Sequence, residues 1–111
     1  MFGSTKYFLC QHSKTTSGRP VEVIDPGLPN MNAGPDFFNA KLKIDGTLWV
    51  GNVEVHTQAS EWLLHRHDCD KAYDTVILHV VGESNCDVYR TNGELVPQMV
   101  LTCPDTVPFA L

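Results

Sequence analysis

The chain has 111 residues, of which 42% are hydrophobic, so it is long enough for one domain with a substantial core. Thirteen acidic residues against eight basic ones give a net charge of −5. This charge argues against a nucleic-acid partner without excluding one, because a bound metal reverses the sign of an acidic site. No run approaches the roughly 20 apolar residues of a membrane span, and the N-terminus lacks a signal-peptide pattern. We therefore expect a single cytoplasmic domain over residues 1–111 with no membrane partner.

The four cysteines are widely spaced and include no Cys-x-x-Cys pair. They are Cys10, Cys69, Cys86 and Cys103. Disulfides are rare in the reducing cytoplasm, and close Cys pairs are the usual sign of a metal site. We expect four reduced and mostly buried thiols, with two disulfides as the alternative for a secreted protein.

The first expected strand covers residues 21–24 and ends at the turn sequence Asp25-Pro26-Gly27. Residues 28–35 contain Pro, Asn and Gly and are expected to form a loop. Loops that a rigid sheet positions often carry function, and this one leads directly to Asp36.

A β-hairpin is expected next, with strands over residues 37–44 and 47–56. The Asp45-Gly46 dipeptide separates alternating apolar positions and favours a type I′ turn, whose two central residues both need positive φ. A hairpin brings the start of its first strand beside the end of its second. We therefore predict that Asp36 lies close to Glu54 and His56.

The strand register decides whether Asp36 and Glu54 can lie on the same face of the hairpin. In a regular register Asp36 would pair with Val55 and point away from Glu54, because strand side chains alternate between faces. A shared site therefore needs a one-residue shift, for which we expect a β-bulge at Gly51-Asn52. Alternatively, Asp36 precedes the regular strand.

The second hairpin strand changes character along its length. Leu48 and Val50 are apolar, whereas Asn52, Glu54 and His56 continue the same face with polar side chains. This pattern alone indicates that the strand leaves the core and that Glu54 and His56 reach its solvated end.

A helix is expected to begin after Ser60, a favourable N-cap, with Glu61 in its first turn. It should run to about His67 and bury Trp62 and Leu63.

The end of this helix carries the sequence His65-x-His67-Asp68-Cys69. One explanation is that the helix dipole favours positively charged side chains near the C-terminal end of the helix. The alternative is a metal cluster of His65, His67 and Asp68, although side chains two positions apart diverge on a helix.

Residues 75–81 form a nearly continuous apolar run, typical of a strand buried on both faces and parallel to its neighbour. His79 inside the run is interpreted as a hydrogen-bonded core residue. A second hairpin is expected about Asn92-Gly93, with strands over residues 87–91 and 94–101. The order predicts an α+β fold, in which a mixed sheet of two hairpins and a buried central strand is joined by one crossover helix.

Five separated motifs follow one another in a distinctive order. They are 21–27 (VEVIDPG), 33–40 (AGPDFFNA), 51–56 (GNVEVH), 62–67 (WLLHRH) and 70–81 (DKAYDTVILHVV). Together they resemble the domain of unknown function 2851 family of uncharacterised bacterial proteins. Members of that family are much longer, which implies that this chain corresponds to an N-terminal part. The family has a basic residue where this chain has Gln58.

Pro35-Asp36 and Glu54-x-His56 also resemble, more weakly, the PD-(D/E)XK superfamily that includes restriction endonucleases. That resemblance implies a restriction endonuclease-like core in which Asp36 and Glu54 hold Mg²⁺ or Mn²⁺ for phosphodiester hydrolysis. His56 stands where the superfamily has Lys. It would act as a general base or as a further ligand, and as a ligand it would favour Mn²⁺ or Zn²⁺.

Three functions are therefore open from the sequence. The first is a metal-dependent, nuclease-like phosphodiesterase with Asp36, Glu54 and His56 at its site. The second is a binding or scaffolding module that keeps the fold without catalysis. The third is a structural metal domain built on His65, His67 and Cys69.

Overall fold

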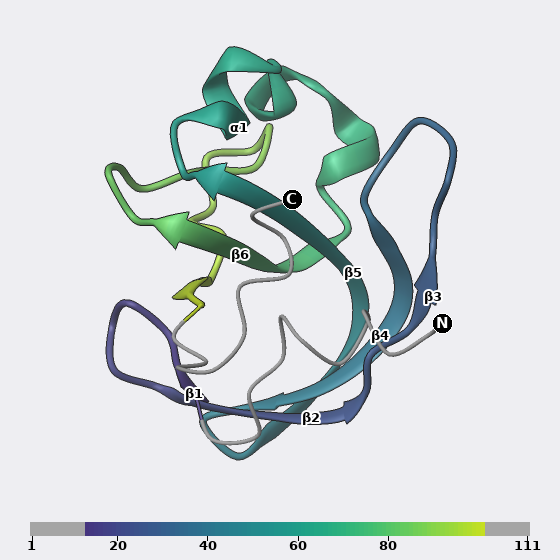
Figure 1. Ribbon diagram of the computed structural model, residues 1–111, viewed down its shortest axis with the longest axis vertical. Coiled ribbons are helices and arrows are strands. Elements are labelled where there is room, and N and C mark those ends of the chain that lie inside the picture. The colour runs from purple at the N-terminus through teal and green to yellow at the C-terminus, as the bar shows by residue number, and fades with distance from the viewer. Residues whose placement is uncertain (1–12, 102–111) are drawn as a thin grey trace.

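The computed structural model describes residues 13–101 and shows a strongly curved sheet (Figure 1). Its strands are β1 (Ser13–Lys14), β2 (Pro20–Asp25), β3 (Leu28–Pro29), β4 (Phe37–Ile44), β5 (Thr47–Gln58), β6 (Val76–Glu83) and β7 (Gln98–Val100). The helical segments are α1 (Glu61–Leu64) and the 3₁₀ turns η2 (His67–Cys69) and η3 (Lys71–Tyr73). These short segments gather at one end of the sheet, near the end of β5. Within residues 13–101, no helix has the length and apolar character needed to cross a membrane.

The strands are ordered β1-β2-β4-β5-β6-β7, and β3 also pairs with β4. The β1–β5 part is antiparallel, whereas β5–β6 and β6–β7 are parallel. The two outer strands approach each other, because Thr15 bridges to Met99 and the Thr16 N–H donates to the Gln98 carbonyl at 2.7 Å. The sheet is therefore nearly closed into a barrel.

The predicted α+β class is wrong. The described residues are 49% strand and 11% helix, and the expected crossover helix is reduced to the four residues of α1. The helix ends early because Arg66 adopts a left-handed conformation with φ of 60°. Two 3₁₀ turns then complete the crossover. The restriction endonuclease-like core that the weaker resemblance implied is not the fold of this chain.

Three local predictions are confirmed. The strand at residues 21–24 lies inside β2, and the hairpin turn has positive φ at both Asp45 (54°) and Gly46 (81°). The apolar run at residues 75–81 lies almost entirely in β6, where every residue from Val76 to Val81 is buried. As expected, β6 runs parallel to β5.

The hairpin register contains the required one-residue shift. Phe37 lies opposite Val53 rather than opposite Glu54. The extra residue belongs to β4, where Asn39 has φ of 60° and donates its N–H to Asn52 Oδ1 at 3.1 Å. The predicted bulge is thus confirmed, but its expected position in β5 is wrong. Asn tolerates positive φ better than most residues, so the bulge forms there.

The second predicted hairpin is only partly present. A turn at Asn92-Gly93 exists, with one bridge between Tyr89 and Leu95. β7 does not pair with residues 87–91, because it runs parallel to β6 instead. Pro97 has no N–H for a ladder, and its carbonyl accepts from the His79 N–H at 2.8 Å, which brings β7 alongside β6.

The core consists of two hydrophobic clusters, and β6 contributes residues to both. The first fills the interior of the curved sheet and contains Val21, Ala40, Leu42, Ile44, Val53, Ile77, Leu78, Val80 and Met99. The second lies beneath the helical segments and contains Ala59, Trp62, Tyr73, Val76, Val81, Val88 and Val96. Burial of Trp62 is confirmed, whereas Leu63 is 47% exposed and was wrongly assigned to the core.

Two of the four cysteines lie in the described part of the chain. Cys69 and Cys86 are both free thiols, as expected, but Cys69 is exposed and Cys86 is half-buried. The prediction of buried thiols is therefore wrong for these two. Cys10 and Cys103 lie outside the described residues.

Candidate metal site

An open cleft of about 400 Å³ lies where the loop before β4, the end of β5 and the segment after α1 meet. Its polar lining comes from all three segments and includes Asp36, Glu54, His56, His65, His67 and Tyr73. The structure therefore brings together the three residues that the hairpin argument selected and both histidines of the weaker cluster, His65 and His67. Asp68 and Cys69 do not line the cleft.

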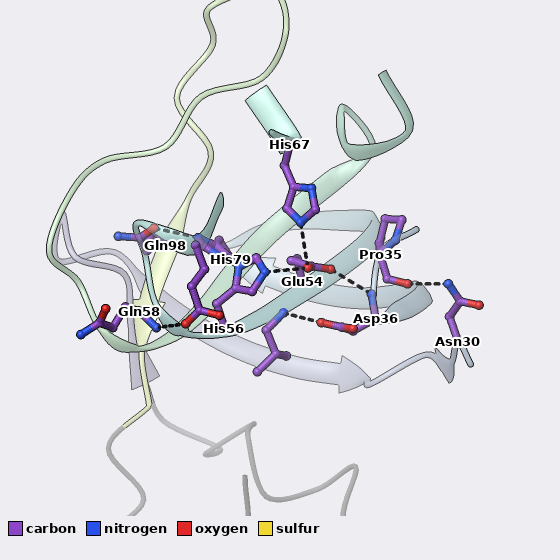
Figure 2. Close-up of polar contacts among 11 residues, drawn as sticks. Asn30, Pro35, Asp36, Glu54, His56, Gln58, His67, His79 and Gln98 are labelled. Carbon is purple, nitrogen blue, oxygen red and sulfur yellow. Dashed lines mark hydrogen bonds and ion pairs between the residues drawn. The ribbon is translucent and has the colours of Figure 1, made fainter. Parts of the chain in front are cut away.

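Backbone N–H groups hold both carboxylates in place (Figure 2). The Asp36 N–H donates to Glu54 Oε1 at 3.1 Å, and the Val55 N–H donates to Asp36 Oδ2 at 2.8 Å. The arrangement is possible because Asp36 precedes β4 and because the bulge shifts the register by one residue. Asp36 therefore fixes the position of the Glu54 carboxylate.

The burial along β5 is the reverse of the one expected. Glu54 and His56 are only 5% and 8% exposed, whereas Leu48 and Val50 are 55% and 56% exposed. The interpretation of Glu54 and His56 as the solvated end of a strand is wrong. The residues that follow β5 turn back over its end and cover these polar side chains, and the start of β5 faces outward.

Three histidines converge in the cleft. His56, His65 and His67 each offer a ring nitrogen, and the three nitrogens lie within 4.8 Å of one another. The helical argument separated His65 from His67, but the left-handed Arg66 between them breaks the helix and turns both rings to one side. A sequence pattern does not show such a reversal.

Glu54 lies between two of these rings (Figure 2). Its Oε2 atom is 3.0 Å from His56 Nε2 and 3.3 Å from His67 Nε2. Burial raises the pKa of Glu54; contact with His56 opposes this rise, and the charge of Asp36 adds to it. A carboxylate kept here as an anion therefore needs positive charge nearby.

His67 is buried, yet neither of its ring nitrogens has a hydrogen-bond partner among the described residues. The ring stacks on Tyr73, with centroids 3.6 Å apart. Burial, helped by His56 and His65, lowers the pKa of His67 to about 4, so the ring is neutral at neutral pH. A buried, neutral imidazole with unused lone-pair capacity is suited to a metal ion.

His56 is connected to the core behind it. Its Nδ1 atom lies 2.8 Å from His79 Nε2, and His79 Nδ1 lies 2.8 Å from Gln98 Oε1. The prediction that His79 is a hydrogen-bonded core residue is confirmed. Its link to the cleft was missed, because only the parallel pairing of β5 with β6 places it beside His56.

A family model described as "Protein of unknown function (DUF2851)" matches residues 3–108, nearly the whole chain. The chain belongs to the DUF2851 family. No curated protein and no solved structure matches it. The family resemblance is therefore confirmed, whereas the resemblance to PD-(D/E)XK nucleases gains no support from these comparisons.

The DUF2851 motifs converge on the cleft. Motif 33–40 supplies Asp36, motif 51–56 supplies Glu54 and His56, and motif 62–67 supplies the other two cleft histidines. Residues 70–81 add Tyr73, so four of the five segments that carry the family resemblance contribute to the cleft lining.

Proposed function

We propose that the cleft binds one divalent transition-metal ion and that the site hydrolyses a phosphodiester. Glu54, His56 and His67 are the proposed ligands. The observation that carries the proposal is the buried His67 ring. Neither of its nitrogens has a hydrogen bond within residues 13–101, and its Nε2 atom lies 3.3 Å from Glu54 Oε2. An unpartnered buried polar group is costly unless it has a ligand.

The donor set favours a particular class of ion. Mg²⁺ prefers oxygen ligands and retains water, whereas imidazole nitrogen suits Zn²⁺, Mn²⁺ and related ions. Two histidines and one glutamate form a known catalytic zinc set. We therefore favour Zn²⁺ or Mn²⁺ over the Mg²⁺ that the two acids alone suggested.

The spacing of the donor atoms fits this set. Ligands about 2.0–2.1 Å from a tetrahedral ion are roughly 3.3 Å from one another. The distances from Glu54 Oε2 to His56 Nε2 and His67 Nε2 are 3.0 and 3.3 Å. Only small side-chain movements would be needed to make these three atoms ligands of one ion.

His65 has a different position from the other two histidines. It is exposed at the rim of the cleft, with its ring centroid 5.2 Å from that of His56. An imidazole at the rim is accessible both to solvent and to a substrate in the cleft. We assign His65 as the general base, and Asp36 as the residue that positions Glu54.

A bound ion would lower the pKa of a water molecule and stabilise charge on a phosphate group. The residues of the chain supply the rest: His65 accepts a proton, and Glu54 balances charge inside the cleft. The phosphodiester substrate class rests on the sequence order of Asp36 and Glu54-x-His56, which resembles that of the PD-(D/E)XK nucleases although the fold differs. Nucleic acid is the corresponding candidate partner.

Calorimetric titration of the chelator-treated protein should show one Zn²⁺ or Mn²⁺ bound per chain and much weaker Mg²⁺ binding. His67→Ala should weaken Zn²⁺ binding by at least roughly 100-fold, because even outer-shell changes cost 10–100-fold. Asp68→Ala is the matched control, since it removes a neighbouring side chain that does not line the cleft. Equal Zn²⁺ affinity in wild type and His67→Ala would contradict the proposed ligand set.

His65→Ala should leave Zn²⁺ affinity nearly unchanged and lower the hydrolysis rate by roughly 10²–10⁴-fold, the usual contribution of a general base. The assay would use bis(p-nitrophenyl) phosphate together with single- and double-stranded nucleic acid. A wild-type protein that binds Zn²⁺ and cleaves none of these substrates would refute the phosphodiesterase function and leave a metal-binding module.

A structural metal site is the second candidate, and one observation favours it. The His65 nitrogen lies within 4.8 Å of those of His56 and His67, close enough to become a fourth ligand and close the coordination sphere. His65→Ala would then weaken Zn²⁺ binding and lower the melting temperature of the Zn²⁺-loaded protein. The same variant therefore distinguishes the two functions.

A further inference from the structure

A continuous chain of side-chain contacts runs from the cleft into the core (Figure 2). His56 Nδ1 lies 2.8 Å from His79 Nε2, and His79 Nδ1 lies 2.8 Å from Gln98 Oε1. All three residues are buried, with exposed fractions of 8%, 0% and 3%. Such a chain excludes water, so the proton on each bond must come from one of the two residues that make it.

Gln98 determines which atom donates and which accepts in each of these hydrogen bonds. Its Nε2 atom donates to the Cys86 carbonyl at 3.0 Å and to Ser84 Oγ at 2.8 Å. A backbone carbonyl can only accept, so the amide nitrogen must face Cys86. The Gln98 oxygen therefore faces His79, and this oxygen can only accept.

The Gln98 oxygen in turn determines which nitrogen carries the proton in His79 and then in His56. His79 Nδ1 must donate to the Gln98 oxygen. Within the described part of the chain the side-chain hydrogen-bond partners of His79 are His56 and Gln98, and neither is a carboxylate. A fully buried imidazolium would be costly there, so His79 is neutral and its Nε2 atom carries a lone pair. His56 Nδ1 must therefore donate to His79, which leaves the proton of a neutral His56 on Nδ1.

We infer that His79 and Gln98 are positioning residues that hold His56 in its Nδ1–H tautomer and direct the Nε2 lone pair into the cleft. The inference rests on the proposed metal site for its purpose, but the direction of the hydrogen bonds does not. Metal-ligating histidines usually donate their other N–H to an outer-shell acceptor, which fixes the tautomer. Here that acceptor is a second histidine, which a buried amide orients in turn.

The arrangement also explains why the cleft needs a cation. With the His56 proton on Nδ1, His56 Nε2 and Glu54 Oε2 both present lone pairs across 3.0 Å. Two acceptors at this distance repel unless a proton or a metal ion lies between them. By holding the His56 proton on Nδ1, His79 and Gln98 make the space beside His56 Nε2 and Glu54 Oε2 favourable for a cation.

The test compares Gln98→Leu, which removes the acceptor, with Gln98→Glu, which retains one. Long-range ¹H–¹⁵N NMR spectra of the metal-free protein report which ring nitrogen of each histidine carries the proton. In the wild type, His79 should be protonated on Nδ1 only. In Gln98→Leu its proton should move to Nε2, and His56 should then carry its proton on Nε2. Gln98→Glu should keep a proton on His79 Nδ1, because its carboxylate oxygen still accepts there.

Zn²⁺ affinity is the second readout. Gln98→Leu should lower it by roughly 10–100-fold, and Gln98→Glu should recover most of the loss. Met99→Leu is the control for a change in β7, because Met99 is equally buried but belongs to the interior cluster of the sheet. It should alter neither the spectra nor the affinity.

The outcomes separate this inference from the proposed function. A wild-type His79 protonated on Nε2, or a His56 tautomer unchanged by Gln98→Leu, would overturn the inference even if Zn²⁺ binds. Wild-type protein with the expected tautomers but no Zn²⁺ binding would support the hydrogen-bond direction and refute the metal site. If Gln98→Leu fails to fold, the wild-type spectrum alone decides the direction.

Discussion

Trp62→Ala should lower the free energy of unfolding by roughly 3–5 kcal/mol, the usual range for removing a large buried aromatic side chain. Trp62 is 0% exposed and lies at the centre of the cluster beneath the helical segments. Its indole N–H also donates to the Tyr89 carbonyl at 3.0 Å, and the substitution would remove that donor. Domains of this kind have about 5–15 kcal/mol of total stability, so the change should be clear in urea-induced unfolding.

Leu63→Ala provides the matched control. Leu63 is adjacent in α1 but 47% exposed, so its truncation should change the free energy of unfolding by roughly 0.5 kcal/mol or less. If the two variants had equal unfolding midpoints, the assignment of Trp62 as the anchor of this segment would be wrong.

Trp62 also connects fold stability to the site. Its ring packs against His67 and His79, with centroid distances of 5.3 and 5.0 Å. One of these histidines is a proposed ligand and the other is a proposed positioning residue. Truncation of Trp62 should therefore weaken Zn²⁺ binding even in the fraction of protein that remains folded.

The sequence was most informative where local chemistry decides the structure. The Asp45-Gly46 turn, the buried strand at residues 75–81 and the proximity of Asp36 to Glu54 follow from turn geometry and strand periodicity. Even the need for a bulge could be predicted, because register parity left no other way to bring the two acids together within a regular strand. The strand that carries the extra residue could not be predicted, because Asn39 is a weaker sequence signal for a bulge than a glycine.

Prediction failed where long-range pairing or a single backbone reversal decides the structure. The closure between Thr15 and Met99 joins segments that no local pattern relates, so it was not predicted. The left-handed Arg66 turned an expected helix into short turns and brought His65 beside His67. The polar face of β5 appeared solvated because the pattern could not show what would fold over it.

Glu54→Gln should have opposite effects on metal binding and on the stability of the metal-free protein. The amide oxygen can still accept the Asp36 N–H, while the new amide N–H can donate to His56 Nε2 in place of the missing cation. The variant should therefore melt at a higher temperature than wild type in the presence of a chelator at neutral pH. The same N–H would occupy the ion's position, so Zn²⁺ affinity should fall by at least roughly 100-fold, more than the loss of an outer-shell partner.

The pH dependence of this difference has a definite sign. Burial raises the pKa of Glu54 above its ordinary value of 4.5, so the folded state holds the proton more tightly than the unfolded state. The stability that this provides is fully present below pH 4.5 and is lost as the pH rises through the folded-state pKa. Glutamine does not ionise, so the advantage of Glu54→Gln should be small near pH 4.5 and should grow toward neutral pH. Melting temperatures measured in chelator at both pH values test this, and a variant less stable than wild type at neutral pH, with Zn²⁺ affinity intact, would remove Glu54 from the ligand set.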